Sequence, residues 1–247
     1  LWMQRAEEYR IASESVFRLA TERLPALVNE SGSAVIEQVG DAKTWVKLNT
    51  AIIVDLDETI LDNSYYQARQ IRAGAEYDEA SWQLWMQEAA ATAVPGAVEF
   101  LQAASRAGHR VFYITNRACA PLPSIDDPCP AKAATRKNLQ RLGLPDADYP
   151  DALMLRGSHP EWRTSDKTSR RTWVASRYRV IAVFGDDLND FVPRADYAKR
   201  RSELADFFGQ RWFLLPNPIY GSWERALLGG VCTPSMTAAQ CAIVTTE

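Results

Sequence analysis

The sequence predicts an α/β fold with a mainly parallel sheet between layers of helices. Short, continuous apolar runs at 51–54, 111–114 and 179–184 are typical of strands that are buried on both faces. Helical segments separate these runs, and such alternation indicates a parallel sheet. Each run ends in polar residues, and ligands of open α/β sheets bind at the carboxyl ends of the strands.

Composition limits the possible classes of protein. The chain has 247 residues, of which 47% are hydrophobic and 24% charged, so disordered and fibrous classes are excluded. A net charge of −3 argues against a partner that is a nucleic acid polymer. No apolar run approaches the roughly 18 residues of a membrane helix. His109 and His159 are too few for a three-histidine zinc site or a two-histidine phosphatase.

The helices expected in the first half are bounded by recognisable signals. An amphipathic stripe stops near Pro25, Pro95 suits a first helical position, and Gly108 suits the position after a helix. These signals predict helices over 4–24, around 34–46 and over 95–108.

An insertion follows the first strand. About 50 residues separate Asp55 from His109, whereas a crossover needs only about 10 to 12. Roughly 30 residues near 62–93 are therefore inserted beside the acidic strand end. We expect one catalytic unit over 1–247, with a core of about 48–61 and 94–230 and a small helical cap from about 1–46 and 62–93.

The second half continues the alternation. Gly143 closes one expected helix, and Ser165 with Asp166 gives a capping signal for the next. We expect helices over 131–142, 166–177 and 189–208, and strands over 152–155, 179–184 and 211–215.

The four cysteines contain no Cys-x-x-Cys pair, which excludes zinc-ribbon and thioredoxin sites. Two local disulfides, Cys119–Cys129 and Cys232–Cys241, would fit, although four cysteines allow three pairings and four free thiols are the alternative. Disulfides would imply an oxidising compartment.

Chemistry-bearing side chains gather where the predicted strands end. Because parallel strands end at one edge of the sheet, we expect these residues to converge there. They are Asp55 with Asp57, Thr115, and Asp186 with Asp190. Lys167 opens the helix before the third strand and can point into the same crevice.

Four carboxylates in one pocket repel one another and raise each other's pKa unless a cation compensates. Oxygen donors without His or Cys suit Mg²⁺, which binds through one or two carboxylates and substrate phosphate. The hydroxyl of Thr115 and the ammonium of Lys167 suit the oxygens of a phosphoryl group. A remaining aspartate can then act as the nucleophile.

These motifs carry a resemblance to a known family. The segments 55–59 with 61–66, 114–117, Lys167 and 185–191 resemble the four motifs of the haloacid dehalogenase superfamily. More narrowly they resemble the class C bacterial nonspecific acid phosphatases, which include outer-membrane lipoprotein 5′-nucleotidases. The segment 215–221 is also similar to the C-terminal part of that family.

The resemblance implies a role for each matching residue. Asp55 would be the nucleophile, and Asp57 the general acid and then the general base. Thr115, Asn116 and Lys167 would bind the phosphoryl group. Mg²⁺ would be held by Asp55, the backbone carbonyl of Asp57 and Asp186, with Asp190 acting through a bound water. Asp187 departs from the family pattern, in which Asn or Thr is usual.

Several residues have two interpretations. Tyr66, Trp85 and Tyr220 are candidates for stacking on a substrate ring, and packing is the alternative. Arg117 is a phosphate contact or a surface arginine. Arg170 with Arg171 is expected on a solvated helix face, and His109 is expected to be structural.

The expected function is a Mg²⁺-dependent acid phosphatase or 5′-nucleotidase that acts on small phosphate monoesters such as nucleoside monophosphates through an aspartyl-phosphate. The alternative is a non-catalytic or ligand-binding surface lipoprotein of the same fold. The resemblance implies a periplasmic, outer-membrane-associated or secreted protein. Membrane contact is expected only through a lipid anchor before Leu1, and a homodimer is possible.

Overall fold

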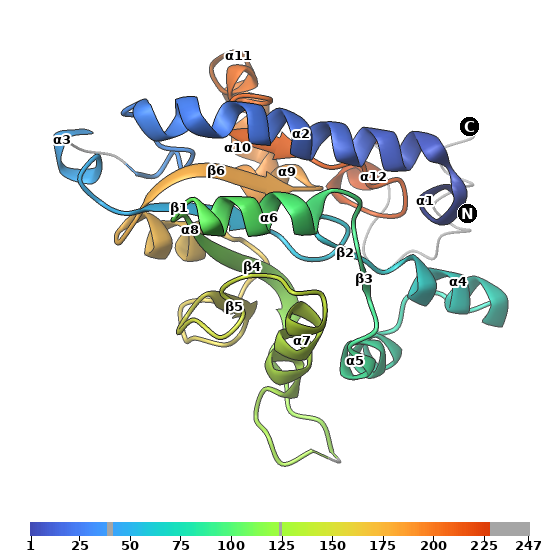
Figure 1. Cartoon of the computed structure of the whole chain (residues 1–247). Coiled ribbons are helices and arrows are strands. Elements are labelled where there is room, and N and C mark those ends of the chain that lie inside the picture. Colours follow the sequence, from blue (N-terminus) through green and yellow to red (C-terminus); the bar gives the residue numbers. More distant parts are fainter. Residues whose placement is uncertain (39–41, 124, 228–247) are drawn as a thin grey trace.

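The computed structural model describes residues 1–38, 42–123 and 125–227. Its centre is a parallel sheet of five strands in the order β5-β4-β1-β6-β7, which confirms the expected α/β fold class (Figure 1). The strands are β1 (Thr50–Val54), β4 (Arg110–Ala118), β5 (Leu153–Arg156), β6 (Arg179–Gly185) and β7 (Trp212–Leu214).

The sheet is buried on both faces, as its continuous apolar strands predict. In β1, Ile52 and Val54 belong to one hydrophobic cluster, whereas Ala51 and Ile53 belong to a second. The first cluster includes side chains of α2 (Glu7–Asn29), α6 (Ala97–Arg106) and α7 (Pro130–Arg141). The second includes side chains of α8 (Thr168–Ala175), α9 (Leu188–Phe191) and α11 (Arg201–Leu204). The molecule therefore has three layers.

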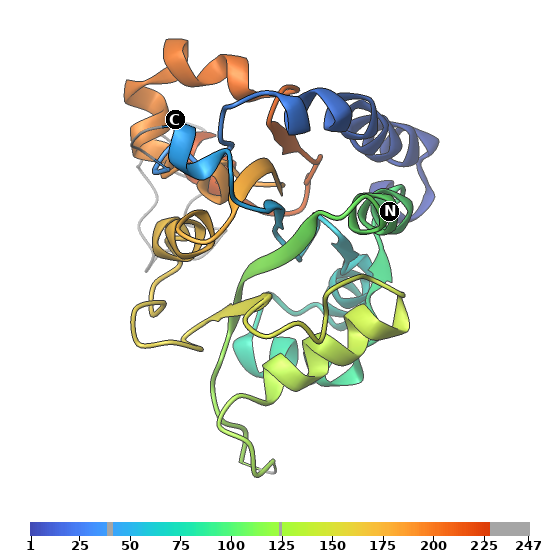
Figure 2. The same cartoon turned by 60° about the vertical axis from the view of Figure 1, so that its left-hand side comes forward.

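The N-terminal helix α2 belongs to one of these layers. The short helix α1 (Trp2–Arg5) precedes it. Figures 1 and 2 show α2 and α6 side by side over the same face of the sheet. Phe17 of α2 stacks on Phe184 of β6 at 5.7 Å and lies 5.8 Å from Phe100 of α6. The apolar stripe of α2 therefore packs on the sheet, and the expected division of the chain into a core and a helical cap stays a prediction.

The helix α2 also continues through Pro25, where an end was expected. Proline removes only one backbone donor, and the last turn is stabilised from outside. Arg179 of β6 donates to the carbonyls of Leu27, Val28 and Glu30, which satisfies acceptors that a helix end leaves free.

The helix expected around 34–46 is much shorter. Among the described residues of this range, only those of α3 (Ala42–Trp45) are helical. The preceding residues are instead bound to β6 and to the end of α8, since Ala34 N–H donates to Val180 O and Gln38 Nε2 donates to the carbonyls of Ala175 and Tyr178. Residues 39–41 lie outside the described residues.

The insertion after β1 forms a compact unit. Strands β2 (Leu61–Asp62) and β3 (Thr92–Ala93) pair antiparallel at its base. Between them lie α4 (Ser64–Ala73) and α5 (Glu79–Glu88), and α5 packs against α7. The Asn138 side chain of α7 bonds both the N–H and the carbonyl of Ala91, which fixes the insertion to the core.

The last third of the chain differs in detail from the expectation. The helical stretch expected over 189–208 is broken into α9, α10 (Arg194–Lys199), α11 and the 3-10 turn Ala205–Phe207, with Pro193 at the first break. Helix α12 (Ser222–Leu227) follows β7 and a loop.

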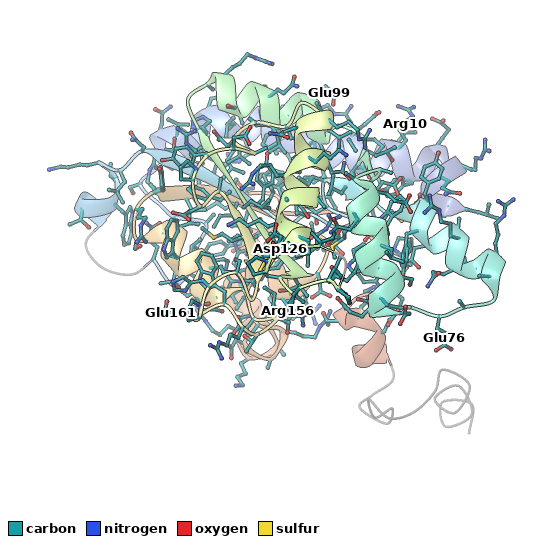
Figure 3. All side chains as sticks on the ribbon, turned by 90° about the horizontal axis from the view of Figure 1, so that it is seen from below. Arg10, Glu76, Glu99, Asp126, Arg156 and Glu161 are labelled. Atoms are coloured by element: carbon teal, nitrogen blue, oxygen red, sulfur yellow. A yellow bond between two sulfur atoms is a disulfide. The ribbon has the colours of Figure 1, made fainter. Side chains whose placement is uncertain are left out.

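One expected disulfide is present. Cys119 and Cys129 are bonded across a separation of ten residues, whereas Cys232 and Cys241 lie outside the described residues. Across 1–38, 42–123 and 125–227, no helix is both long and apolar enough to cross a membrane. Figure 3 shows charged side chains such as Arg10, Glu76, Glu99 and Glu161 at the periphery.

His109 generates a testable prediction about pH. It is buried before β4, and its Nδ1 lies 2.6 Å from Thr50 Oγ1. Burial and the charge of Arg179 lower the pKa of His109 below 6.5. As pH falls through about 6.5, the unfolded chain therefore binds this proton before the folded protein does, and stability is lost.

We expect the unfolding free energy of the parent protein to fall more steeply between pH 7 and 5 than that of His109→Gln. Urea unfolding at several pH values measures this slope. His159→Gln changes an exposed histidine and should retain the parent slope. Equal slopes for the parent and His109→Gln would contradict the prediction.

Candidate active site

Asp55 and Lys167 form a buried ion pair at the carboxyl end of the sheet. Asp55 directly follows β1, and Lys167 directly precedes α8. The Lys167 ammonium contacts Asp55 Oδ1 and lies 2.6 Å from Asp190 Oδ1. Although burial opposes the change, Asp190 and Asp55 raise the pKa of Lys167, so the ammonium form is favoured. A positive charge thus lies against the predicted nucleophile.

Asp186 and Asp190 complete the acidic group. Thr59 Oγ1 donates to Asp186 Oδ1 at 2.9 Å, and Asn217 Nδ2 donates to Asp186 Oδ2 at 2.7 Å. Asp190 folds back over the end of β6, where its Oδ2 accepts from the Asp186 N–H at 3.1 Å. A Cβ on Gly185 would lie 2.4 Å from the Asp190 carboxylate, so glycine is needed for this close approach.

The acidic group fits a divalent cation. Asp55, Asp186 and Asp190 each offer one carboxylate oxygen, and these atoms lie within 4.8 Å of one another. Burial raises the pKa of Asp55 to about 7 despite the opposing charge of Lys167. Burial, together with the charges of Asp190 and Asp55, raises the pKa of Asp186 well above its usual value. Buried oxygen donors with this repulsion are suited to a hard cation.

Asp57 lies apart from these three carboxylates and is held by an arginine. Arg117 donates from Nε to both carboxylate oxygens at 3.1 Å and from Nη2 to Oδ1 at 2.7 Å. Asn63 Nδ2 donates to Oδ1 at 2.9 Å, and Thr115 Oγ1 lies 3.5 Å from Oδ2. The Arg117 side chain is buried rather than on a surface loop. Its contacts fix the direction of the Asp57 carboxylate.

Two of the three predicted phosphate-binding residues, Asn116 and Lys167, line the same pocket, and the third, Thr115, lies beside Asp57. Thr115 is buried within β4, and Asn116 lines a pocket of 620 Å³ together with Lys167 and the acidic residues. Arg170 donates to Thr115 O at 2.6 Å and to Asn116 Oδ1 at 2.8 Å. Asn116 Nδ2 in turn donates to Ser165 O. The end of β4, which carries Asn116, and the loop that carries Lys167 are therefore joined.

The expectation that Arg170 and Arg171 occupy a solvated helix face is wrong, because both are fully buried. Arg171 donates to the carbonyl of Asp190 at 3.1 Å and to Glu37 Oε1 at 2.8 Å. Two adjacent arginines on a short helix give no sequence signal of burial. Their role depends on carbonyls contributed by loops that are distant in the chain.

A second pocket of 520 Å³ adjoins Asp57 and is lined by aromatic side chains. Tyr77, Trp82 and Tyr220 line it together with Arg117 and Asn116. Asp57, Asn116 and Tyr220 line both pockets, so the two spaces meet at these residues.

The three stacking candidates lie in different places. Tyr220 lines both pockets. Tyr66 and Trp85 are buried in the core behind Trp82, with Tyr66 and Trp82 rings 5.0 Å apart and Trp85 Nε1 bonded to Asn63. Tyr77 was not among the candidates, although it belongs to the same inserted segment.

Sequence reasoning also missed Glu58. This residue is fully buried with a positive φ of 59°. Its carboxylate accepts from the Asn63 N–H at 2.9 Å and contacts the Tyr220 hydroxyl. Burial, with the charge of Asp57, raises the pKa of Glu58 to about 8. Glu58 thus links the first acidic loop to the segment after β7.

Comparisons with known proteins agree with this geometry. The family described as HAD superfamily, subfamily IIIB (acid phosphatase), matches residues 26–223. The class C acid phosphatase from Bacillus anthracis is 28% identical, with a TM-score of 0.78 over 99% of this chain and 92% of that chain. Its crystal structure with tungstate bound has a TM-score of 0.79 over 100% and 92%.

A curated plant protein is also similar. "Acid phosphatase 1" of Solanum lycopersicum is 28% identical over 172 residues, or 68% of this chain. The aligned part spans 57% of that protein. The resemblance inferred from the motifs is therefore confirmed at the level of the family and the fold.

The carboxylate triad generates a prediction about metal binding. A cation that binds only the folded protein, at about 100 times its dissociation constant, stabilises it by about 2.7 kcal/mol. We expect Mg²⁺ or Mn²⁺ to raise the melting temperature of the EDTA-treated parent protein by about 5 to 10 °C. Asp186→Asn should lose more than half of this gain. Differential scanning fluorimetry measures both.

Asp166→Asn is the matched control. Asp166 lines the same pocket but lies outside the triad, so this variant should keep the full gain in melting temperature. An equal gain in Asp186→Asn and Asp166→Asn would argue against the site.

Proposed function

We propose, because the chain belongs to the acid phosphatase family of HAD subfamily IIIB, that it hydrolyses phosphate monoesters through an aspartyl-phosphate on Asp55. One observation carries the proposal. Asp55 lies at the carboxyl end of β1 with a buried ammonium against one oxygen and two further carboxylates within reach of a shared cation. A carboxylate placed in this way can act as a nucleophile toward phosphorus.

In the first step, a carboxylate oxygen of Asp55 attacks phosphorus while the bond from phosphorus to the leaving oxygen breaks. Asp57 donates a proton to that oxygen, so the leaving group departs as an alcohol. Arg117 and Asn63 orient Asp57 for this transfer. Without the proton, an alkoxide would have to leave.

In the second step, Asp57, now a carboxylate, accepts a proton from water. The water oxygen bonds to phosphorus as the acyl phosphate bond to Asp55 breaks. Inorganic phosphate leaves, and both aspartates return to their initial states. Arg117 counters the negative charge that Asp57 carries between the two steps.

The phosphoryl oxygens need donors throughout. We assign Lys167, Asn116 and Thr115 to this task, since Lys167 and Asn116 line the pocket with Asp55, and the Thr115 hydroxyl lies 3.5 Å from Asp57 Oδ2 beside it. We infer Mg²⁺ as the metal because the donors are all oxygens. Asp55, Asp186 and Asp190 would hold it, with the backbone carbonyl of Asp57 as a further donor. When bound, the metal would neutralise negative charge on the carboxylates and on the phosphoryl group.

The adjoining pocket supports substrates that carry a ring. Tyr77, Trp82 and Tyr220 give it an aromatic lining next to the proton donor Asp57. Stacking of a base on an aromatic ring contributes about 1 to 3 kcal/mol. Nucleoside monophosphates, and hence a 5′-nucleotidase activity, fit this lining. Tyr66 and Trp85 would act only by supporting Trp82.

We place the protein outside the cytoplasm. The Cys119–Cys129 disulfide supports this location, because such bonds persist in oxidising compartments. Outer-membrane association, a lipid anchor and a homodimer stay predictions.

The proposal predicts the effect of removing the nucleophile. Asp55→Asn keeps the shape of the side chain but not its charge, so the first step should fail. We expect Mg²⁺-dependent hydrolysis of p-nitrophenyl phosphate by the parent protein, loss of this activity in EDTA, and a fall of more than about 1,000-fold in kcat for the variant.

Asp148→Asn removes an exposed carboxylate and serves as the control, with the parent rate expected. A folded parent protein that gives no turnover with Mg²⁺ would favour the alternative of a non-catalytic binding protein.

The aromatic pocket predicts a substrate preference. AMP can place its base on the aromatic lining, whereas glycerol phosphate has no ring to stack. We expect kcat/KM for AMP to exceed that for glycerol phosphate by about tenfold or more. Steady-state phosphate release measures both values. Equal values would contradict the assignment of the pocket.

A further inference from the structure

The segment 215–222, after β7, forms a wall of the active site through contacts with three acidic residues. Asn217 Nδ2 donates to Asp186 at 2.7 Å, the Tyr220 hydroxyl donates to Glu58, and Ser222 donates to Asp187. Tyr220 lines both pockets, Ile219 lines the aromatic pocket, and Gly221 lines the acidic one. The position of this segment therefore determines the shape of both spaces.

Asp187 binds the far end of this segment. Its Oδ1 accepts from Ser222 Oγ at 2.7 Å and from the Asn189 N–H at 2.9 Å, and its Oδ2 accepts from the Ser222 N–H. Arg194 Nε donates to Ser222 Oγ at 2.6 Å.

These contacts need a carboxylate. Two oxygens of one side chain cap the start of α9 and bind the first residue of α12 at the same time. Asparagine has one acceptor oxygen, so it could retain the cap but would turn an amide N–H toward the Ser222 N–H or hydroxyl. The approach is close, since a Cβ on Gly221 would lie 3.2 Å from Asp187 Oδ2 and 2.6 Å from the Trp223 ring.

We propose that Asp187 and Ser222 form a latch that fixes the 217–222 segment as the shared wall of the two pockets and so sets the preference for ring-bearing leaving groups. Both are positioning residues, because they act through Tyr220 and its neighbours. This proposal rests on the proposed phosphatase function. The fixed wall keeps Tyr220 beside Asp57 at the junction of the pockets.

The latch is tested by two independent measurements on the parent protein, Asp187→Asn and Ser222→Ala. The first is hydrogen exchange of peptides from 215–224, read by mass spectrometry. A lost hydrogen bond to a charged group should speed exchange there by about tenfold, with β1 peptides unchanged. The second is steady-state kinetics with AMP and with glycerol phosphate. We expect KM for AMP to rise by about tenfold, and KM for glycerol phosphate to rise by less than about threefold.

Asp196→Asn is the matched control, since it removes an exposed carboxylate of α10 and should leave exchange and kinetics unchanged. Ser222→Ala keeps the Asp187 cap of α9, so it carries the test if Asp187→Asn does not fold.

Unchanged exchange in the folded variants would overturn the latch. Faster exchange with an unchanged ratio of the two KM values would overturn its role in specificity. A parent protein without phosphatase activity would refute the proposed function and with it that role, while exchange would still decide whether the latch exists.

Discussion

The concentration of buried carboxylates at one edge of the sheet is the constraint on which the site depends. Asp55, Asp186 and Asp190 lie close enough to share a cation, and Lys167 lies against two of them. Removing charged groups from water is costly unless opposite charges and hydrogen bonds compensate. The pKa values of Asp55 and Asp186 are raised because the charge of Lys167 does not fully compensate for the burial of these carboxylates. This surplus of negative charge suits a divalent cation, and the charge of a bound cation would in turn attract an anionic substrate.

Buried arginines keep this arrangement in place. Arg170 binds Thr115 and Asn116 of β4 and the backbone of the loop before Lys167, whereas Arg171 binds the carbonyl of Asp190. Arg117 forms an ion pair with the Asp57 carboxylate. This contact holds the predicted proton donor apart from the cation site. Each guanidinium offers several donors in a fixed plane, so one side chain can join several loops. The loops of the site are thereby held by the core of the protein.

Much of this site could be predicted from the sequence, because parallel strands bring their polar ends to one edge. Asp55 and Asp186 directly follow buried strands, and Thr115 lies at the carboxyl-terminal part of another, so the strand pattern predicts their convergence. Contacts between distant segments carry no such signal. The roles of Glu58, Arg170 and Asp187 depend on partners at Tyr220, Thr115 and Ser222. The packing of α2 on the sheet carries no such signal either, since an amphipathic stripe does not specify which surface it will cover.

The central claim is that Asp55 becomes phosphorylated during turnover. Rapid acid quench of the Mg²⁺-loaded protein with a phosphate monoester labelled in its phosphoryl group measures this directly. The account predicts a label that is released by hydroxylamine, as expected for an acyl phosphate, and that maps to the peptide containing Asp55. A label on another residue would contradict the account, as would phosphate release with no labelled protein at any time in the first turnover.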